Sequence, residues 1–294
     1  MRIAITGASG FVGSALVPAL RTAGHEVVRL VRSADDDGDA VGWNPATGEL
    51  DTARLGVLDA VVHLAGENVA AGRWTAARRQ AIADSRGPAT GRLCRSLAAL
   101  PVRPKVLVAA SATGIYGDRG DMPLDEDSAH GSGFLAEVAL AWEAGTRPAA
   151  EAGVRVVNLR IGMVLDRSGG ALARLLPPFR LGLGGVLGSG RQWLGWITRH
   201  DLVRAIQAAL GDERLRGPVL AVAPDAVTNR TFTKALGAAL RRPTVLPVPR
   251  FALRLLFGAM ADELLLASQR VRPTRLLATG FAFAQPTLAQ ALQG

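Results

Sequence analysis

Short apolar runs rich in valine and isoleucine alternate along the chain with longer segments whose apolar residues recur at helical spacing. This alternation is typical of βαβ units, in which helices join parallel strands that are buried on both faces. It predicts strands near Ile3–Thr6, Val27–Val31, Ala60–Leu64, Val106–Ser111, Arg155–Arg160 and Val219–Ala223. It predicts helices near Phe11–Ala23, Ala76–Asp84, Thr90–Leu100, Phe134–Ala152 and Asp201–Leu210.

These elements predict the α/β fold class: a Rossmann-type doubly wound parallel sheet with a smaller C-terminal region on the substrate side. We expect the helix from Phe134 to break near Gly145 and Pro148. The pattern changes after Pro224, where Asn229–Leu240 and Phe251–Leu266 are predicted helices and VLPVP is a short extended piece. The closing GFAFAQPTLAQAL predicts a short strand and a last helix. The expected domains are residues 1–224 and residues 225–294.

Composition limits the class of protein. The 294 residues can bury a substantial core, and the only cysteine, Cys94, excludes a disulfide within the chain. Neither a signal-peptide core nor eighteen uninterrupted apolar residues are present, so we expect a cytoplasmic protein with no membrane partner. The histidines lack partners at metal-ligand spacing, and no metal site is expected.

The formal net charge of +9 raises the question of nucleic acid. The basic residues are nearly all arginines, and they are scattered, with only pairs such as Arg78 and Arg79. Few aromatic residues stand beside them, so no continuous basic surface for stacking bases is evident. We expect a solvated arginine-rich surface and no nucleic-acid partner.

The strongest local signal is RIAITGASGFVGSALVPAL, in which a strand, three glycines and a helix follow one another. Glycines at 7, 10 and 13 permit a tight turn, close approach of the backbone to a pyrophosphate, and close packing of the helix on the strand. A strand before and a helix after make this pattern more specific than glycines alone. The contacts expected from the loop are Gly7, Ser9, Gly10, Phe11, Val12 and Gly13.

The end of the second strand indicates which nicotinamide nucleotide is bound. NAD binders place a carboxylate there, whereas an arginine accommodates the 2′-phosphate of NADP. The strand ends at Val31 and Arg32, which favours NADP(H) as the cofactor. Asp35–Asp37 follow closely, and a loop folded back would reverse this interpretation.

Six stretches of sequence resemble one group of proteins. They are TGASGFVG, HLAGEN at 63–68, SATGIYGD at 111–118, LRIGMVL at 159–165, PPFRLGLGG at 177–185 and GSGRQWLGWI at 188–197. Together they resemble the epimerase family of extended, atypical short-chain dehydrogenases, and LPVP, SQRVRPTRL and GFAF look like the small C-terminal domain of that group. The resemblance implies a Rossmann fold, NADP(H) binding and a small-molecule substrate that it does not name. Extended members often pair through two helices, which leaves a homodimer open.

Cofactor contacts carry over onto matching positions. Val31 and Arg32 look like the adenosine-phosphate contact, and Leu64 and Ala65 like the strand end that faces adenine and ribose. Gly66 then allows close approach, and Arg86 matches an arginine that relatives offer to the cofactor. Strand packing is the alternative role of Leu64 and Ala65.

The catalytic dyad of the wider superfamily is missing. There, a tyrosine phenol gives or takes the substrate proton, and a lysine four residues later lowers its pKa. The matching positions hold Phe134 and Val138 here. The only tyrosine, Tyr116, is followed four residues later by Gly120, so no alignment restores the dyad.

A polar loop remains as the candidate catalytic site. Ser111 and Thr113 stand near the superfamily's serine or threonine, although Ala112 fits one alignment, and Tyr116 is the only phenol nearby. The catalytic candidates are therefore Ser111, Thr113 and Tyr116, with packing as the alternative role of Tyr116. Carboxylates of the same loop are further candidates: Asp118, Asp121 and Glu126. Residues 177–197 are expected on the other side of the cleft, where an anionic substrate with a flat or apolar part would suit Arg180, Arg191, Gln192, Trp193 and Trp196. The alternative is that these are ordinary loop arginines and core tryptophans.

Two functions stay open at this point. One is an NADP(H)-dependent oxidoreductase or epimerase-like enzyme that acts without the usual dyad. The other is a catalytically silent NADP(H)-binding sensor or partner-binding protein, which the missing dyad motivates.

Overall fold

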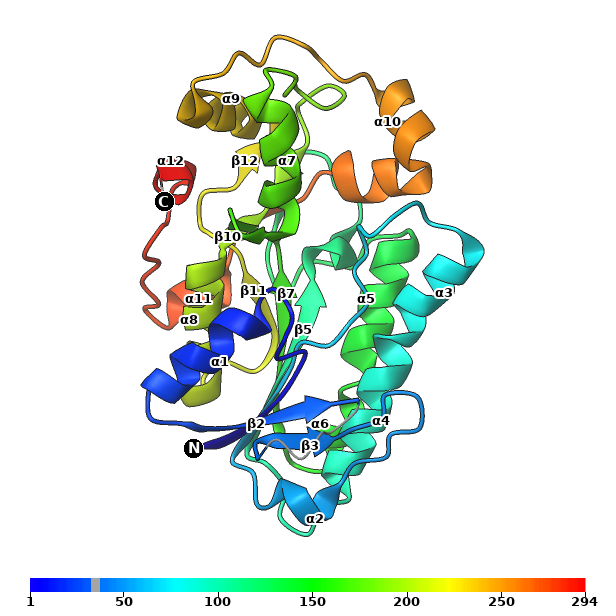
Figure 1. The fold of residues 1–294 in the computed structure, drawn as a ribbon, viewed down its shortest axis with the longest axis vertical. Coiled ribbons are helices and arrows are strands. Elements are labelled where there is room, and N and C mark those ends of the chain that lie inside the picture. Colours follow the sequence, from blue (N-terminus) through cyan, green and yellow to red (C-terminus); the bar gives the residue numbers. More distant parts are fainter. Residues whose placement is uncertain (33–37, 294) are drawn as a thin grey trace.

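A computed structural model describes residues 1–32 and 38–293 and centres on one sheet (Figure 1). The sheet has seven parallel strands in the order β11-β7-β5-β4-β1-β2-β3. They are β1 (Arg2–Thr6), β2 (Glu26–Val31), β3 (Ala40–Gly42), β4 (Ala60–His63), β5 (Val106–Ala112), β7 (Arg155–Ile161) and β11 (Gly217–Ala221). The chain leaves β1 in one direction and continues from β4 in the other. The carboxyl ends of β1 and β4 therefore mark a topological switch point, where such sheets bind ligands.

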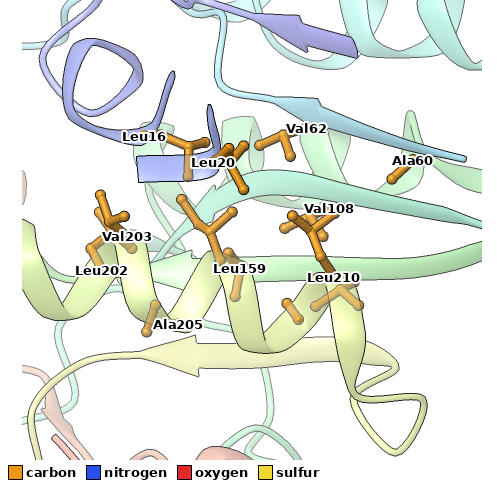
Figure 2. Packing of buried hydrophobic residues seen from close by; sticks show 14 of the residues in the cluster. Leu16, Leu20, Ala60, Val62, Val108, Leu159, Leu202, Val203, Ala205 and Leu210 are labelled. Carbon is orange, nitrogen blue, oxygen red and sulfur yellow. The ribbon is translucent and has the colours of Figure 1, made fainter. Parts of the chain in front are cut away.

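Helices cover both faces of this sheet, because successive side chains of a strand point to opposite faces. Ile3 and Ile5 of β1 pack on one face, together with Leu16 and Leu20. Figure 2 shows this layer, in which side chains from α1 and α8 meet those of the strands. That face carries α1 (Gly13–Thr22), α8 (Arg199–Gly211) and α11 (Thr274–Ala278). The other face carries α4 (Gly87–Ala98), α5 (Phe134–Ala144) and α6 (Arg147–Glu151), and α3 (Ala76–Asp84) packs against α4.

A smaller part lies at the carboxyl ends of the strands, at the top of Figure 1. Its strand pairs are β8–β10, β9–β12 and β6–β13. It contains β6 (Pro123–Leu124), β8 (Met163–Asp166), α7 (Gly170–Arg180), β9 (Trp193–Leu194), β10 (Trp196–Thr198), β12 (Val227–Thr228), α9 (Asn229–Leu240), α10 (Arg250–Phe257), β13 (Arg270–Val271) and α12 (Leu288–Gln293). The short helix α2 (Thr52–Leu55) lies at the opposite end of the molecule. None of the helices within the described ranges is long and apolar enough to cross a membrane.

The break predicted in the helix from Phe134 is confirmed, since α5 ends at Ala144 and α6 begins at Arg147. Two other predictions were wrong. The helix expected over Phe251–Leu266 stops at Phe257, because Gly258 adopts a φ of +62°, and a π turn, η2 (Ala261–Leu265), follows. Residues 280–283 form no strand; Phe281 and Phe283 pack edge to face instead, with ring centroids 4.8 Å apart. The pattern also missed β3 and α7.

Candidate functional site

The glycine loop connects β1 to α1 at the switch point. Gly7 has a φ of +69°, a conformation that side chains other than glycine rarely adopt. A Cβ on Gly7 would lie 2.9 Å from the Leu64 carbonyl carbon, and one on Gly13 would lie 2.2 Å from the Gly7 oxygen. The Gly10 amide donates a 3.0 Å hydrogen bond to the same oxygen. The loop therefore has no room for side chains at Gly7 and Gly13, and Ser9 and Gly10 are exposed above it.

The side chain of Phe11 packs closely against the backbone of Gly169 and Gly170. A Cβ at Gly169 or Gly170 would meet the Phe11 ring at 2.6 or 2.8 Å. The Arg199 guanidinium lies over the same ring, 5.2 Å from its centroid. Val12, next along the chain, immediately precedes α1, so the residues predicted to contact a phosphate are those that begin this helix.

A buried hydrogen-bond chain holds the end of β4 against the end of β1. The Thr6 hydroxyl lies 2.7 Å from Nδ1 of His63 and accepts from the Leu64 and Ala65 amides at 3.1 and 3.2 Å. Nε2 of His63 lies 2.9 Å from the Thr90 hydroxyl. Burial lowers the pKa of His63 to about 4, so the imidazole is neutral at pH 7. Thr6 and His63 thus orient two of the predicted cofactor residues, and spacing along the sequence did not reveal them.

The predicted phosphate contact lies at the end of β2. Val31 is half-buried as the last residue of the strand, and Arg32 is exposed immediately after it. The three aspartates that would reverse the preference for NADP(H), Asp35–Asp37, lie outside the described residues.

Arg86 is buried beneath the loop that follows β4. Its guanidinium donates to the Glu67 carbonyl at 2.8 Å and to the Ile82 carbonyl at 3.2 Å. It also lies 4.8 Å from the ring centroid of Trp142. Burial lowers the pKa of Arg86 to about 10. Arg86 therefore supports the backbone next to Gly66, where an added Cβ would lie 3.6 Å from the guanidinium.

Ser111 and Tyr116 belong to one buried polar network built around Arg160. The Ser111 hydroxyl donates to Oε1 of Glu143 at 2.8 Å, and Arg160 donates to both oxygens of that carboxylate at 2.8 and 3.0 Å. Burial by itself would lower the pKa of Arg160. The hydrogen-bonded Glu143 carboxylate acts in the opposite direction, and the resulting pKa lies above the ordinary value. The guanidinium is thus a permanent charge that ties α5 to β5 and β7.

The Tyr116 phenol is committed to the same network. Its hydroxyl accepts from Nη1 of Arg160 at 2.8 Å and donates to the Asp125 carbonyl at 2.8 Å. The side chain is 0% exposed, and burial raises its pKa to about 12. This geometry favours a structural role over proton transfer, because the one phenolic proton is already donated to the backbone.

Thr113 differs from Ser111 in having a free hydroxyl. It opens the short helix η1 (Thr113–Tyr116) directly after β5 and is 7% exposed. Its hydroxyl has no hydrogen-bond partner within residues 1–32 and 38–293. Among the three candidates, only Thr113 therefore retains a donor for a substrate oxygen.

The positions of the missing dyad are filled by packing residues. Val138 is buried within α5, and Phe134 begins the helix. The Phe134 ring meets Trp74 with centroids 5.2 Å apart, and the Arg79 guanidinium lies 5.3 Å from its centroid. No ionisable group replaces the phenol or the ammonium at these positions.

Residues of the C-terminal part contact the start of α5 and the loop after Tyr116. Glu263 of η2 accepts from the Leu135 amide at 2.8 Å, which caps the first turn of α5. Ser268 donates from its amide to Asp118 at 3.1 Å and from its hydroxyl to the Gly120 carbonyl at 2.5 Å. Gln269 donates to the Gly117 carbonyl at 3.2 Å. Ser268 and Gln269 therefore hold the loop after Tyr116, and Glu263 holds the start of α5.

Of the other predicted substrate-side groups, Arg180 and Arg191 are exposed and their side chains bond to none of the described residues. The remaining groups are buried or have structural partners. Asp121 accepts from the Trp193 indole at 2.8 Å. Glu126 is buried, and one of its oxygens accepts from two backbone amides at 3.1 Å. Gln192 donates to the carbonyls of Leu187 and Leu265, and Trp196 is completely buried. Across residues 1–32 and 38–293, no group of three histidine, cysteine, aspartate or glutamate side chains is placed to hold a metal ion.

Comparison with known proteins identifies the group to which this arrangement belongs. The model of the "NAD dependent epimerase/dehydratase family" matches residues 3–222, more than half of the chain. The chain belongs to this family. A second model, described as "Domain of unknown function (DUF1731)", matches residues 248–294. Both the family and the Rossmann-type fold expected from the sequence are confirmed.

Relatives match this epimerase family member over its full length. "Epimerase family protein Mb2239" of Mycobacterium bovis is 46% identical over 290 residues, covering 99% of this chain and 96% of that protein. The crystal structure of human epimerase family protein SDR39U1 with NADPH superposes with a TM-score of 0.91 at 36% identity, covering 100% of this chain and 98% of that one. UDP-N-acetylglucosamine 4-epimerase from Bacillus cereus shares only the fold, with a TM-score of 0.74 at 19% identity, covering 100% of this chain and 97% of that one.

The loop of this family member fits a dinucleotide on its own geometry. The crowded glycines bring backbone rather than side chains to the start of α1, where amides without helical partners attract a phosphate. The sequence predicted this loop because the motif is local. It missed Glu143 and Arg160, since no short motif connects a helix residue to a strand residue seventeen positions later.

Proposed function

We propose that this protein binds NADP(H) and acts as an atypical oxidoreductase or epimerase-like enzyme on a small molecule. The observation that carries the proposal is the backbone cradle of Gly7, Gly10 and Gly13 at the switch point between β1 and β4. Family membership and the human relative crystallised with NADPH support it.

The pyrophosphate, the 2′-phosphate and the adenosine of the dinucleotide each have residues suited to hold them. The amides at the start of α1, near Phe11 and Val12, suit the pyrophosphate, and exposed Arg32 suits a ribose 2′-phosphate. Leu64 and Ala65, held by Thr6, border the adenosine side. When bound, the nicotinamide supplies or accepts a hydride.

The chain's own residues position the substrate. Thr113 offers the free hydroxyl that can hydrogen-bond a substrate oxygen, while Ser111 is engaged with Glu143. Tyr116 and Asp121 are committed to structural hydrogen bonds, and Glu126 is buried with one oxygen bonded to two backbone amides. We therefore assign proton exchange to water and substrate positioning to Thr113.

Deuterium transfer tests this function directly. The full chain is incubated with NADPH carrying deuterium at either face of nicotinamide C4 and with a metabolite extract, and labelled products are sought by mass spectrometry. A product labelled only with the wild-type chain, and not with Gly13→Ala, supports a reductase. No label from either face, with NADPH binding confirmed, contradicts net reduction and leaves internal redox epimerisation as the remaining enzyme reaction.

A silent NADP(H) sensor is the second candidate function. Phe134 and Val138 at the dyad positions favour it, together with the buried phenol of Tyr116. A sensor requires different affinities for NADP⁺ and NADPH, because a ligand that binds two states equally shifts neither. Calorimetric titration with both forms distinguishes the candidates: unequal affinity with no labelled product supports the sensor, and equal affinity contradicts it.

A further inference from the structure

Positive charge is segregated in two segments of the chain. Residues 167–200 and 226–261 contain eleven arginines and lysines and no aspartate or glutamate. Removing these eleven from the 34 basic residues of the chain leaves 23 against 25 acidic residues. The whole excess of positive charge therefore belongs to these two segments, although the arginines are scattered along the sequence.

The fold brings parts of these segments together at one end of the molecule, at the top of Figure 1. The Val248 amide donates to the Val186 carbonyl at 2.8 Å, and the Gly188 amide donates to the Val248 carbonyl at 2.9 Å. A Cβ on Gly182 would lie 4.0 Å from Pro243. The loop after α7 and the loop before α10 thus lie side by side, and α10 continues from them.

Exposed apolar side chains gather on the same elements. Twelve large apolar residues of the described ranges are exposed, and seven belong to these two loops and α10. Phe251 and Leu255 are 74% and 73% exposed, one helical turn apart on the outer side of α10. The seven are Leu181, Leu183, Val245, Leu246, Phe251, Leu255 and Leu256.

We call residues 180–191 and 241–256 the apolar-basic crest. Its arginines are all exposed: Arg180, Arg191, Arg241, Arg242, Arg250 and Arg254. Arg250 and Arg254 both pair with Asp262 at 2.9 Å, and the crest itself contains no acid. The other four arginines make no ion pair with the described residues. Apolar side chains bordered by such arginines are typical of surfaces that dock on anionic lipid.

We propose that the apolar-basic crest docks this protein on an anionic lipid surface, with the outer side of α10 entering the headgroup layer. A second copy of the chain is a poorer occupant, because a two-fold interface would place the same positive patch against itself. Nucleic acid fits less well, because the exposed apolar residues are aliphatic apart from Phe251 and offer few rings for stacking bases. The sequence predicted no membrane partner from the lack of a spanning segment, but surface docking needs none.

Vesicle co-sedimentation of the full chain tests the proposal. The probes are vesicles of phosphatidylcholine alone and of phosphatidylcholine mixed with phosphatidylserine. We expect binding to the mixed vesicles only, weakening as salt is raised. The double variant Arg180→Gln with Arg242→Gln should bind about 30-fold more weakly, at roughly fivefold for each lost charge. Phe251→Ser with Leu255→Ser should weaken binding by about tenfold or more, because two apolar side chains no longer insert.

Matched control variants remove equivalent residues elsewhere. Arg103→Gln with Arg147→Gln, and Val57→Ser with Val102→Ser, change exposed residues outside the crest and should leave binding within about twofold. Thermal melts of every variant exclude unfolding as the cause of a loss. Absence of binding to mixed vesicles at low salt overturns the proposal, as does an equal loss in crest and control variants. A wild-type dimer that Phe251→Ser with Leu255→Ser dissociates, without vesicle binding, would instead make the crest an interface between copies.

Discussion

Gly13 shows how the absence of a side chain shapes the cofactor loop. An added Cβ would meet three backbone atoms of Gly7 and Ala8 within 2.8 Å, and backbone cannot rotate away as a flexible side chain can. We expect Gly13→Ala to weaken NADPH binding by about tenfold or more, corresponding to about 1.4 kcal/mol or more. Fluorescence titration with NADPH measures this loss.

Gly211→Ala is the control for that substitution. Gly211 ends α8, and an added Cβ would meet no atom within 4 Å. NADPH affinity should stay unchanged in this variant. Equal affinity in wild type, Gly13→Ala and Gly211→Ala would contradict the role given to the loop.

Tyr116→Phe separates a structural phenol from a catalytic one. The substitution removes the hydroxyl that accepts from Arg160 and donates to Asp125, and we expect unfolding free energy to fall by about 2 kcal/mol. Deuterium transfer to the product should persist at a comparable rate, because the phenolic proton is not used. Urea unfolding and the labelling assay measure the two effects. Loss of transfer with NADPH binding and fold intact would instead identify Tyr116 as the proton donor.

His63 makes stability depend on pH. Its folded pKa of about 4 lies below the ordinary value of 6.5, so the folded state binds fewer protons than the unfolded state between these values. The stabilisation is complete above pH 6.5 and is lost as pH falls toward 4, by up to about 3 kcal/mol. Urea unfolding at a series of pH values should show this slope in wild type, as a free energy of unfolding that falls from pH 6.5 to pH 4.

His63→Gln should flatten the slope between pH 6.5 and 4, because the titrating group is gone. His130→Gln, which changes an exposed histidine, should leave the slope as in wild type. Parallel slopes in all three proteins would show that His63 does not cause the pH dependence.

Glycine positions were predictable from the sequence, whereas the polar network was not. A strand, three glycines and a helix form a local pattern with a local physical reason. Ser111, Glu143 and Arg160 come together only because β5 and β7 are neighbours and α5 packs beside them. Sequence reasoning therefore placed Ser111 and Tyr116 in the site but could not see that both are engaged there.

At the scale of elements, the start of α5 depends on a residue from the other end of the chain. Gly133 precedes the helix and offers no capping side chain, and Glu263 supplies the acceptor for the Leu135 amide instead. A carboxylate at a helix N-terminus also interacts favourably with the helix dipole. Glu263→Ala should lower unfolding free energy by about 1 kcal/mol and accelerate hydrogen exchange of the Leu135 amide.

Glu137→Ala is the matched control for this cap. Glu137 lies in the first turn of α5 but is exposed and accepts no backbone hydrogen bond there among the described residues. We expect a change within about 0.5 kcal/mol and unchanged exchange at Leu135. Similar effects of both substitutions would mean that charge alone, and not the Glu263 cap, stabilises the helix.

Errors in the predicted elements have identifiable physical causes. Apolar periodicity continues from α10 into residues 258–266, so it predicted one helix where Gly258 in fact interrupts the backbone. In GFAF, the alternating aromatic residues suggested a strand, yet both rings pack against the main core without a partner strand. Periodicity reports which residues are buried and does not by itself report which backbone conformation buries them.

At the scale of the whole molecule, one core cluster joins the two predicted domains. Phe179 and Trp196 from the first pack with Phe232, Leu236 and others from the second. Leu288 and Leu292 of the last helix complete this cluster. The boundary predicted at residue 224 therefore passes through a shared core, even though the sequence pattern changes there.

Fragments divided at residue 224 test whether this core is needed for folding. Residues 1–224 alone would expose Leu172, Leu176, Phe179 and Trp196, which are buried in the full chain. Large apolar side chains contribute about 1.5–3 kcal/mol each when buried, and a domain has only about 5–15 kcal/mol of net stability. We expect the fragment to lose a cooperative urea transition and to bind the dye ANS. Mixing it with residues 225–294 should restore part of the transition and of NADPH binding, because the same apolar surfaces can pack across the break. A fragment 1–224 that unfolds cooperatively and binds NADPH like the full chain would show instead that residues 1–224 are an independent domain and that the shared core only docks the second part.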